Sequence, residues 1–71
     1  MRELRFGAYD KGGGERLRTN ISIVVEDDGR CLFIERYEYN QRRAFPNAAA
    51  LEEFLSRWCG YRHCCLARLE D

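Results

Sequence analysis

The run Ala48–Gly60, AAALEEFLSRWCG, decides the fold of this chain. Its large apolar side chains follow the spacing i, i+3, i+4 and i+7, and they are Leu51, Phe54, Leu55 and Trp58. This spacing places them on one stripe of a helix about three turns long. We therefore predict an amphipathic helix whose apolar stripe closes the hydrophobic core.

Residues on both sides of this run indicate where the helix begins and ends. Asn47 stands directly before it, and asparagine is a favoured N-cap residue because its side chain accepts a backbone N–H of the first turn. Phe45 or Pro46 is placed to pack on Leu51 as a hydrophobic staple. Gly60 is predicted as the residue just beyond the helix end.

Two alternating segments precede this helix, and each indicates a β-strand. The first, Arg2–Tyr9, places Leu4, Phe6 and Ala8 on one side. The second, Leu17–Glu26, has an apolar face made of Leu17, Thr19, Ile21, Ile23 and Val25. The glycine-rich stretch Asp10–Glu15 separates the two segments and is predicted to form a flexible turn.

The pair Asp28-Gly29 predicts a hairpin, because Asp-Gly between alternating apolar segments favours a two-residue turn. This turn would pair Val25 with Leu32 and Ile23 with Ile34, which would keep the apolar residues of both strands on the core side. The third strand, Cys31–Tyr39, would then direct its other side chains to the opposite face, namely Cys31, Phe33, Glu35, Tyr37 and Tyr39.

The remaining segments complete a small mixed fold. Asn40–Phe45 is predicted as a polar loop, and the alternation over residues 61–69 predicts a short fourth strand. A right-handed crossover would run this strand parallel to the third strand and beside the first. We therefore predict one α+β domain over residues 1–71, a four-stranded, mostly antiparallel sheet of order β-β-β-α-β with one helix packed on one face.

The composition fits a small folded domain with balanced charge. Of the 71 residues, 45% are hydrophobic and 34% are charged, and the formal net charge is zero. Balanced charge argues against a strong non-specific nucleic-acid binder, which usually carries a marked basic excess. The cations are eleven arginines and one lysine, a usage typical of a GC-rich genome such as that of a bacterium or one of its phages.

The sequence shows no targeting or membrane-spanning pattern. The N-terminal residues alternate charged and apolar side chains instead of forming the apolar stretch of a signal peptide. No run approaches the ~20 apolar residues of a membrane span. A cytoplasmic location without a membrane partner is therefore predicted, with the four cysteines reduced.

One cluster, Cys59, His63, Cys64 and Cys65, carries side chains able to bind metal or react as thiols. Neighbouring Cys64 and Cys65 would point to opposite sides of a strand, which disfavours a tetrahedral zinc site. The favoured interpretation is that these cysteines are small buried hydrophobic residues. A thiol or metal site remains an alternative. We expect no catalytic residues, no cofactor and no metal, and hence no enzyme.

The face of the sheet away from the helix is the predicted functional surface. One helix covers one side of a sheet, so the other side should be polar. Instead this surface is predicted to combine aromatic side chains with arginine, a composition typical of protein interfaces. The candidate protein-binding residues are Arg5, Tyr9, Arg18, Val24, Phe33, Glu35, Tyr37 and Tyr39.

The leading functional hypothesis is a non-enzymatic protein-binding domain, with homodimerisation as one form of it. Its small size and arginine-rich composition suggest a phage-type inhibitor or modulator of a larger bacterial complex, as anti-CRISPR proteins are. The alternative is a single-stranded nucleic-acid binder that uses Phe33, Tyr37, Arg5 and Arg18, with Arg42 and Arg43 holding phosphate. The predicted position of Glu35 between Phe33 and Tyr37, and the zero net charge, argue against that alternative.

Overall fold

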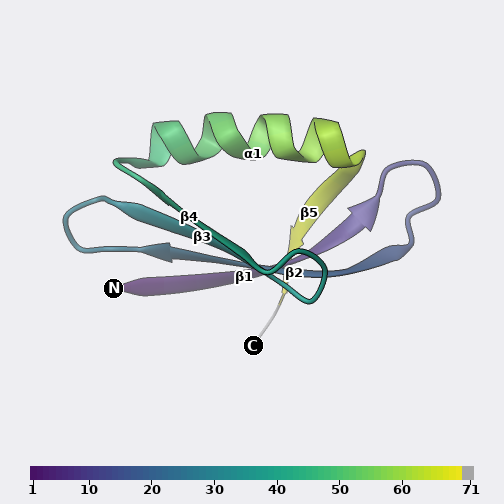
Figure 1. Ribbon diagram of the computed structural model, residues 1–71, viewed down its shortest axis with the longest axis horizontal. Helices are drawn as coiled ribbons and strands as arrows, with labels where there is room; N and C mark the ends of the chain where they lie inside the picture. Colours follow the sequence, from purple (N-terminus) through teal and green to yellow (C-terminus); the bar gives the residue numbers. More distant parts are fainter. Residues whose placement is uncertain (70–71) are drawn as a thin grey trace.

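The structure is a computed structural model that describes residues 1–69, and these residues form five strands and one helix. The elements are β1 (Arg2–Asp10), β2 (Arg16–Val25), β3 (Cys31–Arg36), β4 (Gln41–Phe45), α1 (Ala48–Arg62) and β5 (Cys64–Arg68). The strands pair antiparallel in the order β4-β3-β2-β1-β5, and α1 lies over one face of the sheet (Figure 1). The predicted α+β class is confirmed, with five strands in this part of the chain instead of four.

The helix forms much as predicted. It begins at Ala48, and the side-chain oxygen of Asn47 accepts the N–H of Ala50 at 2.9 Å. Leu51 and Trp58 are buried, and the other two members of the predicted stripe pack against the core. The helix continues past Gly60 and ends at Arg62, because His63 adopts the left-handed conformation (φ 53°) and caps it instead.

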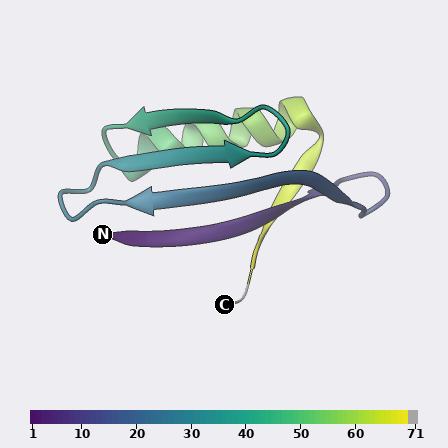
Figure 2. The ribbon, with the colours of Figure 1, turned by 60° about the horizontal axis from the view of Figure 1, so that its bottom comes forward.

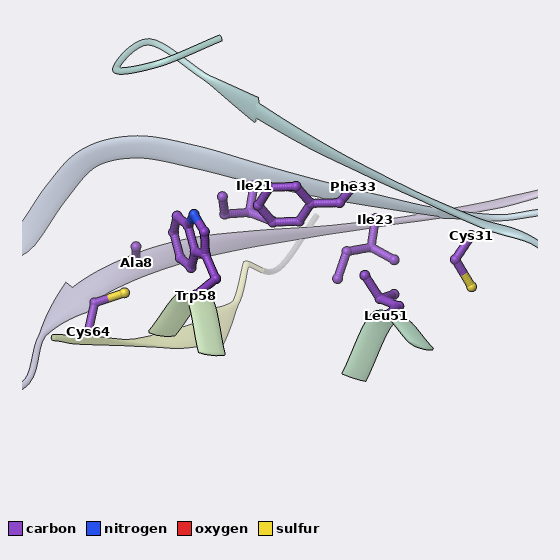
Figure 3. Close-up of a cluster of buried hydrophobic side chains, with 8 residues drawn as sticks. All are labelled: Ala8, Ile21, Ile23, Cys31, Phe33, Leu51, Trp58 and Cys64. Carbon is purple, nitrogen blue, oxygen red and sulfur yellow. The ribbon is translucent and has the colours of Figure 1, made fainter. Parts of the chain in front are cut away.

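Phe33 lies at the centre of the hydrophobic core and has no exposed surface. Its ring meets Phe54 edge-on at 4.9 Å and Trp58 at 5.6 Å between ring centroids. Figure 3 shows Phe33, Ile21 and Trp58 gathered together, with Ile23 and Leu51 beside them. Edge-to-face ring pairs stabilise a core beyond their buried area, so these contacts fix α1 on the sheet.

The predicted register of the β2–β3 hairpin is wrong by one residue. Ile23 lies opposite Phe33, and Val25 lies opposite Cys31. A shift of one residue exchanges the two faces of a strand. Leu32 and Ile34 therefore lie on the face away from α1, whereas Phe33 and Glu35 lie beneath the helix.

The cause of this shift is the length of the connection between the strands. Five residues, Glu26–Arg30, form the loop, and the N–H of Glu26 donates to the carbonyl of Arg30 at 2.8 Å. Gly29 takes a positive φ of 94°, and Asp28 accepts the N–H of Arg30 at 3.1 Å. The longer loop lets β3 turn the bulky ring of Phe33 into the core.

Gln41–Phe45, predicted as a loop, forms the edge strand β4. It pairs with β3 and places Arg43 opposite Phe33 and Phe45 opposite Cys31. The strand was missed because its sequence has little apolar alternation. Charged side chains are common on edge strands, where they discourage pairing with other chains.

The last strand lies beside β1, as predicted, but its direction relative to β3 was predicted wrongly. β5 is antiparallel to β1 and therefore also antiparallel to β3. The additional strand β4 reverses the chain once more before the helix. The crossover thus joins β4 to β5, which run parallel to each other at opposite edges of the sheet.

Candidate functional site

The candidate site is the sheet face opposite α1, here called the outer face. Figure 2 shows this face in front, with α1 behind the strands. No helix or strand among residues 1–69 covers it. Strand register places on it Glu3, Arg5, Gly7, Tyr9, Arg16, Arg18, Asn20, Ser22, Val24, Leu32, Ile34, Arg36, Arg42, Ala44, Cys65 and Ala67.

This face is strongly basic although the whole chain has no net charge. Within residues 1–69 it carries five arginines and one acidic residue, Glu3. The arginines are Arg5, Arg16, Arg18, Arg36 and Arg42. The last four form no ion pair with any carboxylate in the described part of the chain. Their charges are therefore uncompensated.

Two of these arginines are held by neutral neighbours on the same face. Arg16 donates to the side-chain oxygen of Asn20 at 3.0 Å, and its guanidinium lies 5.9 Å from the centre of the Tyr9 ring. Arg36 donates to the Ser22 hydroxyl at 3.3 Å. Neutral acceptors orient a guanidinium without cancelling its charge, so both remain available to an anion.

Two small residues of the outer face, Gly7 and Ala67, lie side by side on β1 and β5. Gly7 lies opposite Asn20 on one side and Ala67 on the other. A Cβ atom built on Gly7 would lie 3.1 Å from Nε of Arg16, so the glycine lets that side chain lie close to the sheet. The side chains here are short, so the guanidinium of Arg16 lies close to the backbone of the sheet.

An aliphatic patch, made of Val24, Leu32, Ile34 and Ala44, occupies the end of the outer face nearest the β2–β3 loop. Val24 lies opposite Leu32, and Leu32 lies opposite Ala44. Ala44 is exposed and the other three are half-buried. This patch is apolar surface adjoining the basic region, which is a composition found at protein interfaces.

The structure divides the predicted site residues into three groups. Arg5, Tyr9, Arg18 and Val24 lie on the outer face, as predicted. Tyr37 and Tyr39 lie in the turn between β3 and β4 and are exposed, by 67% and 63%. Phe33 and Glu35 are fully buried on the helix side. The prediction that these two residues face outward is wrong, because β3 is shifted by one residue.

Glu35 is the centre of a buried polar network. Its carboxylate accepts the Thr19 hydroxyl at 2.7 Å, the Gln41 amide at 2.8 Å and the Arg62 guanidinium at 3.2 Å. Arg62 also pairs with Glu38 at 2.5 Å. Burial lowers the pKa of Arg62, but the two carboxylates outweigh burial and leave it raised. This network ties the end of α1 to β3.

Tyr39 belongs to this network and not to the outer face. The Arg62 guanidinium lies 4.6 Å from the centre of the Tyr39 ring and 5.2 Å from that of Trp58. Such stacking lowers the energy of a cation that is partly removed from water. Tyr39 therefore has a structural role among the described residues, whereas Tyr37 remains at the rim of the outer face.

Sequence reasoning missed two outer-face arginines, Arg16 and Arg36, and it named Arg42 as a possible phosphate contact without placing it in the sheet. Arg16 falls between the predicted turn Asp10–Glu15 and the predicted strand Leu17–Glu26, and Arg42 falls in the predicted loop. Arg36 was hidden by the register error. The correct register would have revealed a pattern, because these arginines share one strand face with Arg18 and Arg5.

The Cys59–Cys65 segment does not form a recognisable metal centre. Within residues 1–69 no group of three or more His, Cys, Asp or Glu side chains is placed to hold a metal ion. Burial raises the pKa of the Cys59 thiol, and burial with the nearby Cys59 raises that of Cys64 to about 11. Thiols with raised pKa values are weak nucleophiles at neutral pH. Cys65 is exposed.

A comparison of the chain with protein-family models, with curated proteins and with solved structures finds no match. In the described part of the chain, α1 is too short and too polar to cross a lipid bilayer.

Proposed function

We propose that this domain is a non-enzymatic binding module that holds single-stranded nucleic acid against its outer face. The observation that supports this function is a set of arginines that form no ion pair with a carboxylate among residues 1–69, namely Arg16, Arg18, Arg36 and Arg42. Cations that contact phosphates release condensed counterions, which favours binding. Arginine also stacks on bases and binds phosphate through paired donors.

The sequence raised two objections to nucleic-acid binding, the position of Glu35 and the zero net charge, and neither applies to the outer face. Glu35 would repel a phosphate backbone if it lay on the outer face, but it is buried on the other side of the sheet. The zero net charge is a sum over the whole chain and does not describe the outer face alone. Acidic side chains gather in the β2–β3 loop at Asp27 and Asp28 and on α1 at Glu52 and Glu53.

The shape of the outer face favours a single strand over a duplex. The five strands of the sheet, spaced by about 4.8 Å, span about 19 Å, which exceeds the ~12 Å width of the DNA major groove. A broad sheet face instead suits unpaired nucleotides, whose bases stack on aromatic side chains. Tyr9 on the face and Tyr37 at its rim supply such rings.

Fluorescence anisotropy with labelled single-stranded DNA and RNA oligonucleotides tests this function. The double variant Arg18→Gln/Arg42→Gln should bind about tenfold more weakly or worse, because it loses two charge-assisted phosphate contacts. Arg57→Gln is the matched control, since Arg57 is an exposed arginine on α1 that pairs with Glu53. Absence of binding at low salt, or equal loss in the control, would overturn the proposal.

A protein partner is the second candidate function, and the aliphatic patch favours it. Half-buried aliphatic residues beside arginines match the centre and rim of a protein interface. In this case the domain is an inhibitor or modulator of a larger bacterial complex, of the anti-CRISPR type, or it forms a homodimer through the patch. Light scattering after size exclusion tests the homodimer. A dimer that Leu32→Asp separates supports it, and a monomeric wild type excludes it.

A further inference from the structure

A small hollow opens on the outer face near the turn that joins β3 to β4. It has a volume of about 140 Å³, and its lining combines polar residues with apolar ones. The polar residues are Arg5, Asn20, Ser22, Arg36 and Tyr37, and the apolar ones are Phe6, Ile21 and Leu69. A water molecule takes up about 30 Å³ in the liquid, so the hollow has room for roughly four or five waters. One tetrahedral oxyanion is smaller than this space and fits in it.

The hydrogen bonds within the hollow leave several donors free to face a ligand. The Ser22 hydroxyl oxygen already accepts from Arg36 at 3.3 Å, so its hydrogen remains to donate. The side-chain oxygen of Asn20 already accepts from Arg16 at 3.0 Å, so its NH₂ group remains to donate. Guanidinium groups are donors only. A ligand that offers only acceptors fits these walls, and phosphate is such a ligand.

The hollow is also a built site. Ser22 is 3% exposed, and its hydroxyl oxygen accepts a hydrogen bond from Arg36 at 3.3 Å. Tyr37 borders the hollow with a φ of 82°, a conformation that costs energy for any residue with a side chain. Its N–H donates to the side-chain oxygen of Asn40 at 3.1 Å, which supports this geometry. Strained residues of this kind concentrate at functional sites.

We infer that this hollow is a phosphate-binding subsite, in which Arg36, Ser22 and Asn20 donate hydrogen bonds to one phosphate group of a bound strand. The inference rests on the proposed function and makes it more specific. It assigns Arg36 to a fixed phosphate, whereas Arg18 and Arg42, farther from the hollow, provide general attraction to the rest of the backbone.

Titration with inorganic phosphate, followed by amide chemical shifts in NMR, tests the subsite. Ionic strength is kept constant by exchanging phosphate for chloride. The wild type should show saturable shifts centred on Asn20, Ser22 and Arg36. Arg36→Gln should weaken binding about tenfold, as expected for loss of one charge-assisted contact. Arg57→Gln should bind as the wild type does. Non-saturable shifts, no shifts, or equal affinities in both variants would overturn the inference.

Two further variants separate a lost ligand contact from a folding defect. Tyr37→Gly relieves the positive φ and removes one wall of the hollow, so it should fold at least as well as the wild type and bind phosphate more weakly. Ser22→Ala removes one donor with little change in shape. A Tyr37→Gly protein that melts normally and binds phosphate with unchanged affinity would contradict the built site.

Oligonucleotide affinity then distinguishes the inference from the function it rests on. If Arg18→Gln/Arg42→Gln weakens oligonucleotide binding but Arg36→Gln and Ser22→Ala do not, the subsite is overturned and the proposed function stands. If phosphate binds in the hollow but no oligonucleotide binds, the proposed function is overturned and the subsite stands as a site for a small phosphate compound.

Discussion

At the scale of single residues, β3 sends an aromatic ring and a carboxylate to the same side of the sheet. Phe33 packs beneath α1, and Glu35 follows it two residues later with no exposed surface. A buried carboxylate is costly unless polar groups surround it. Here Thr19, Gln41 and Arg62 provide those groups, and no buried side-chain polar atom among the described residues lacks a partner.

Glu35→Ala should lower the free energy of unfolding by about 3–5 kcal/mol, because it leaves the Arg62 guanidinium partly buried beside fewer acceptors. Urea denaturation measures this loss. Glu38→Ala is the control, since Glu38 is exposed and its ion pair should contribute less than about 1 kcal/mol. Equal, small losses in both variants would show that the buried network does not stabilise the fold.

Phe33→Ala should lower the free energy of unfolding by about 3–5 kcal/mol, because it leaves a cavity between Phe54 and Trp58. Leu32→Ala removes a half-buried side chain of the outer face and should cost about 1 kcal/mol. Thermal melting of the two variants checks the register. A larger loss of stability for Leu32→Ala than for Phe33→Ala would contradict the observed register and support the hairpin pairing predicted from the sequence.

At the scale of elements, the helix and the strands with a clear apolar period could be predicted from the sequence. The stripe from Leu51 to Trp58 predicted α1, and the alternation of β1 and β2 predicted both strands and their core faces. The Asp-Gly pair predicted a hairpin but not its loop length, since five-residue loops also use a glycine at positive φ. That length decides the register.

The candidate site was harder to predict, because it depends on which face of β3 and β4 is open. In β3, Leu32 and Ile34 are as apolar as Cys31 and Phe33, so the pattern alone does not decide. The contacts of the Phe33 ring with Phe54 and Trp58 favour the arrangement in which Phe33 faces α1. In β4, pairing with β3 outweighs the weak strand pattern of Gln41–Phe45.

His63→Gly should stabilise the protein by up to about 1 kcal/mol, because His63 caps α1 in the left-handed conformation that glycine adopts without strain. The melting temperature should therefore rise. Gly60→Ala is a useful comparison, since nothing lies within 4 Å of a Cβ built there and the position is helical. A fall in melting temperature for His63→Gly would mean that the histidine side chain itself stabilises the helix end.

The start of β5 should make stability sensitive to alkaline pH. Burial raises the pKa of Cys64 from 9.0 to about 11, so the folded state retains a proton that the unfolded state has lost between these values. The contribution of the Cys64 thiol to the free energy of unfolding is therefore fully present below pH 9 and is lost as the pH rises toward 11. Urea denaturation of the wild type and Cys64→Ala between pH 7 and 11 measures this. A pH dependence unchanged in Cys64→Ala would contradict it.

At the scale of the whole molecule, zero net charge conceals a separation of charge. The outer face carries five arginines and, within residues 1–69, one acidic residue, whereas the β2–β3 loop carries Glu26, Asp27 and Asp28. Under the proposed function, such a separation would orient the molecule as it approaches a polyanion, so that the sheet meets the backbone first. It would also make the affinity strongly dependent on salt.

The salt dependence of oligonucleotide affinity tests this account most directly. If Arg16, Arg18, Arg36 and Arg42 each contact a phosphate, the slope of log K against log salt should be about −3, at ≈ −0.7 for each contact with a single strand. Arg18→Gln should bring the slope closer to zero by about 0.7, and Arg57→Gln should leave it unchanged. A slope near zero, or one that Arg18→Gln does not alter, would contradict the account.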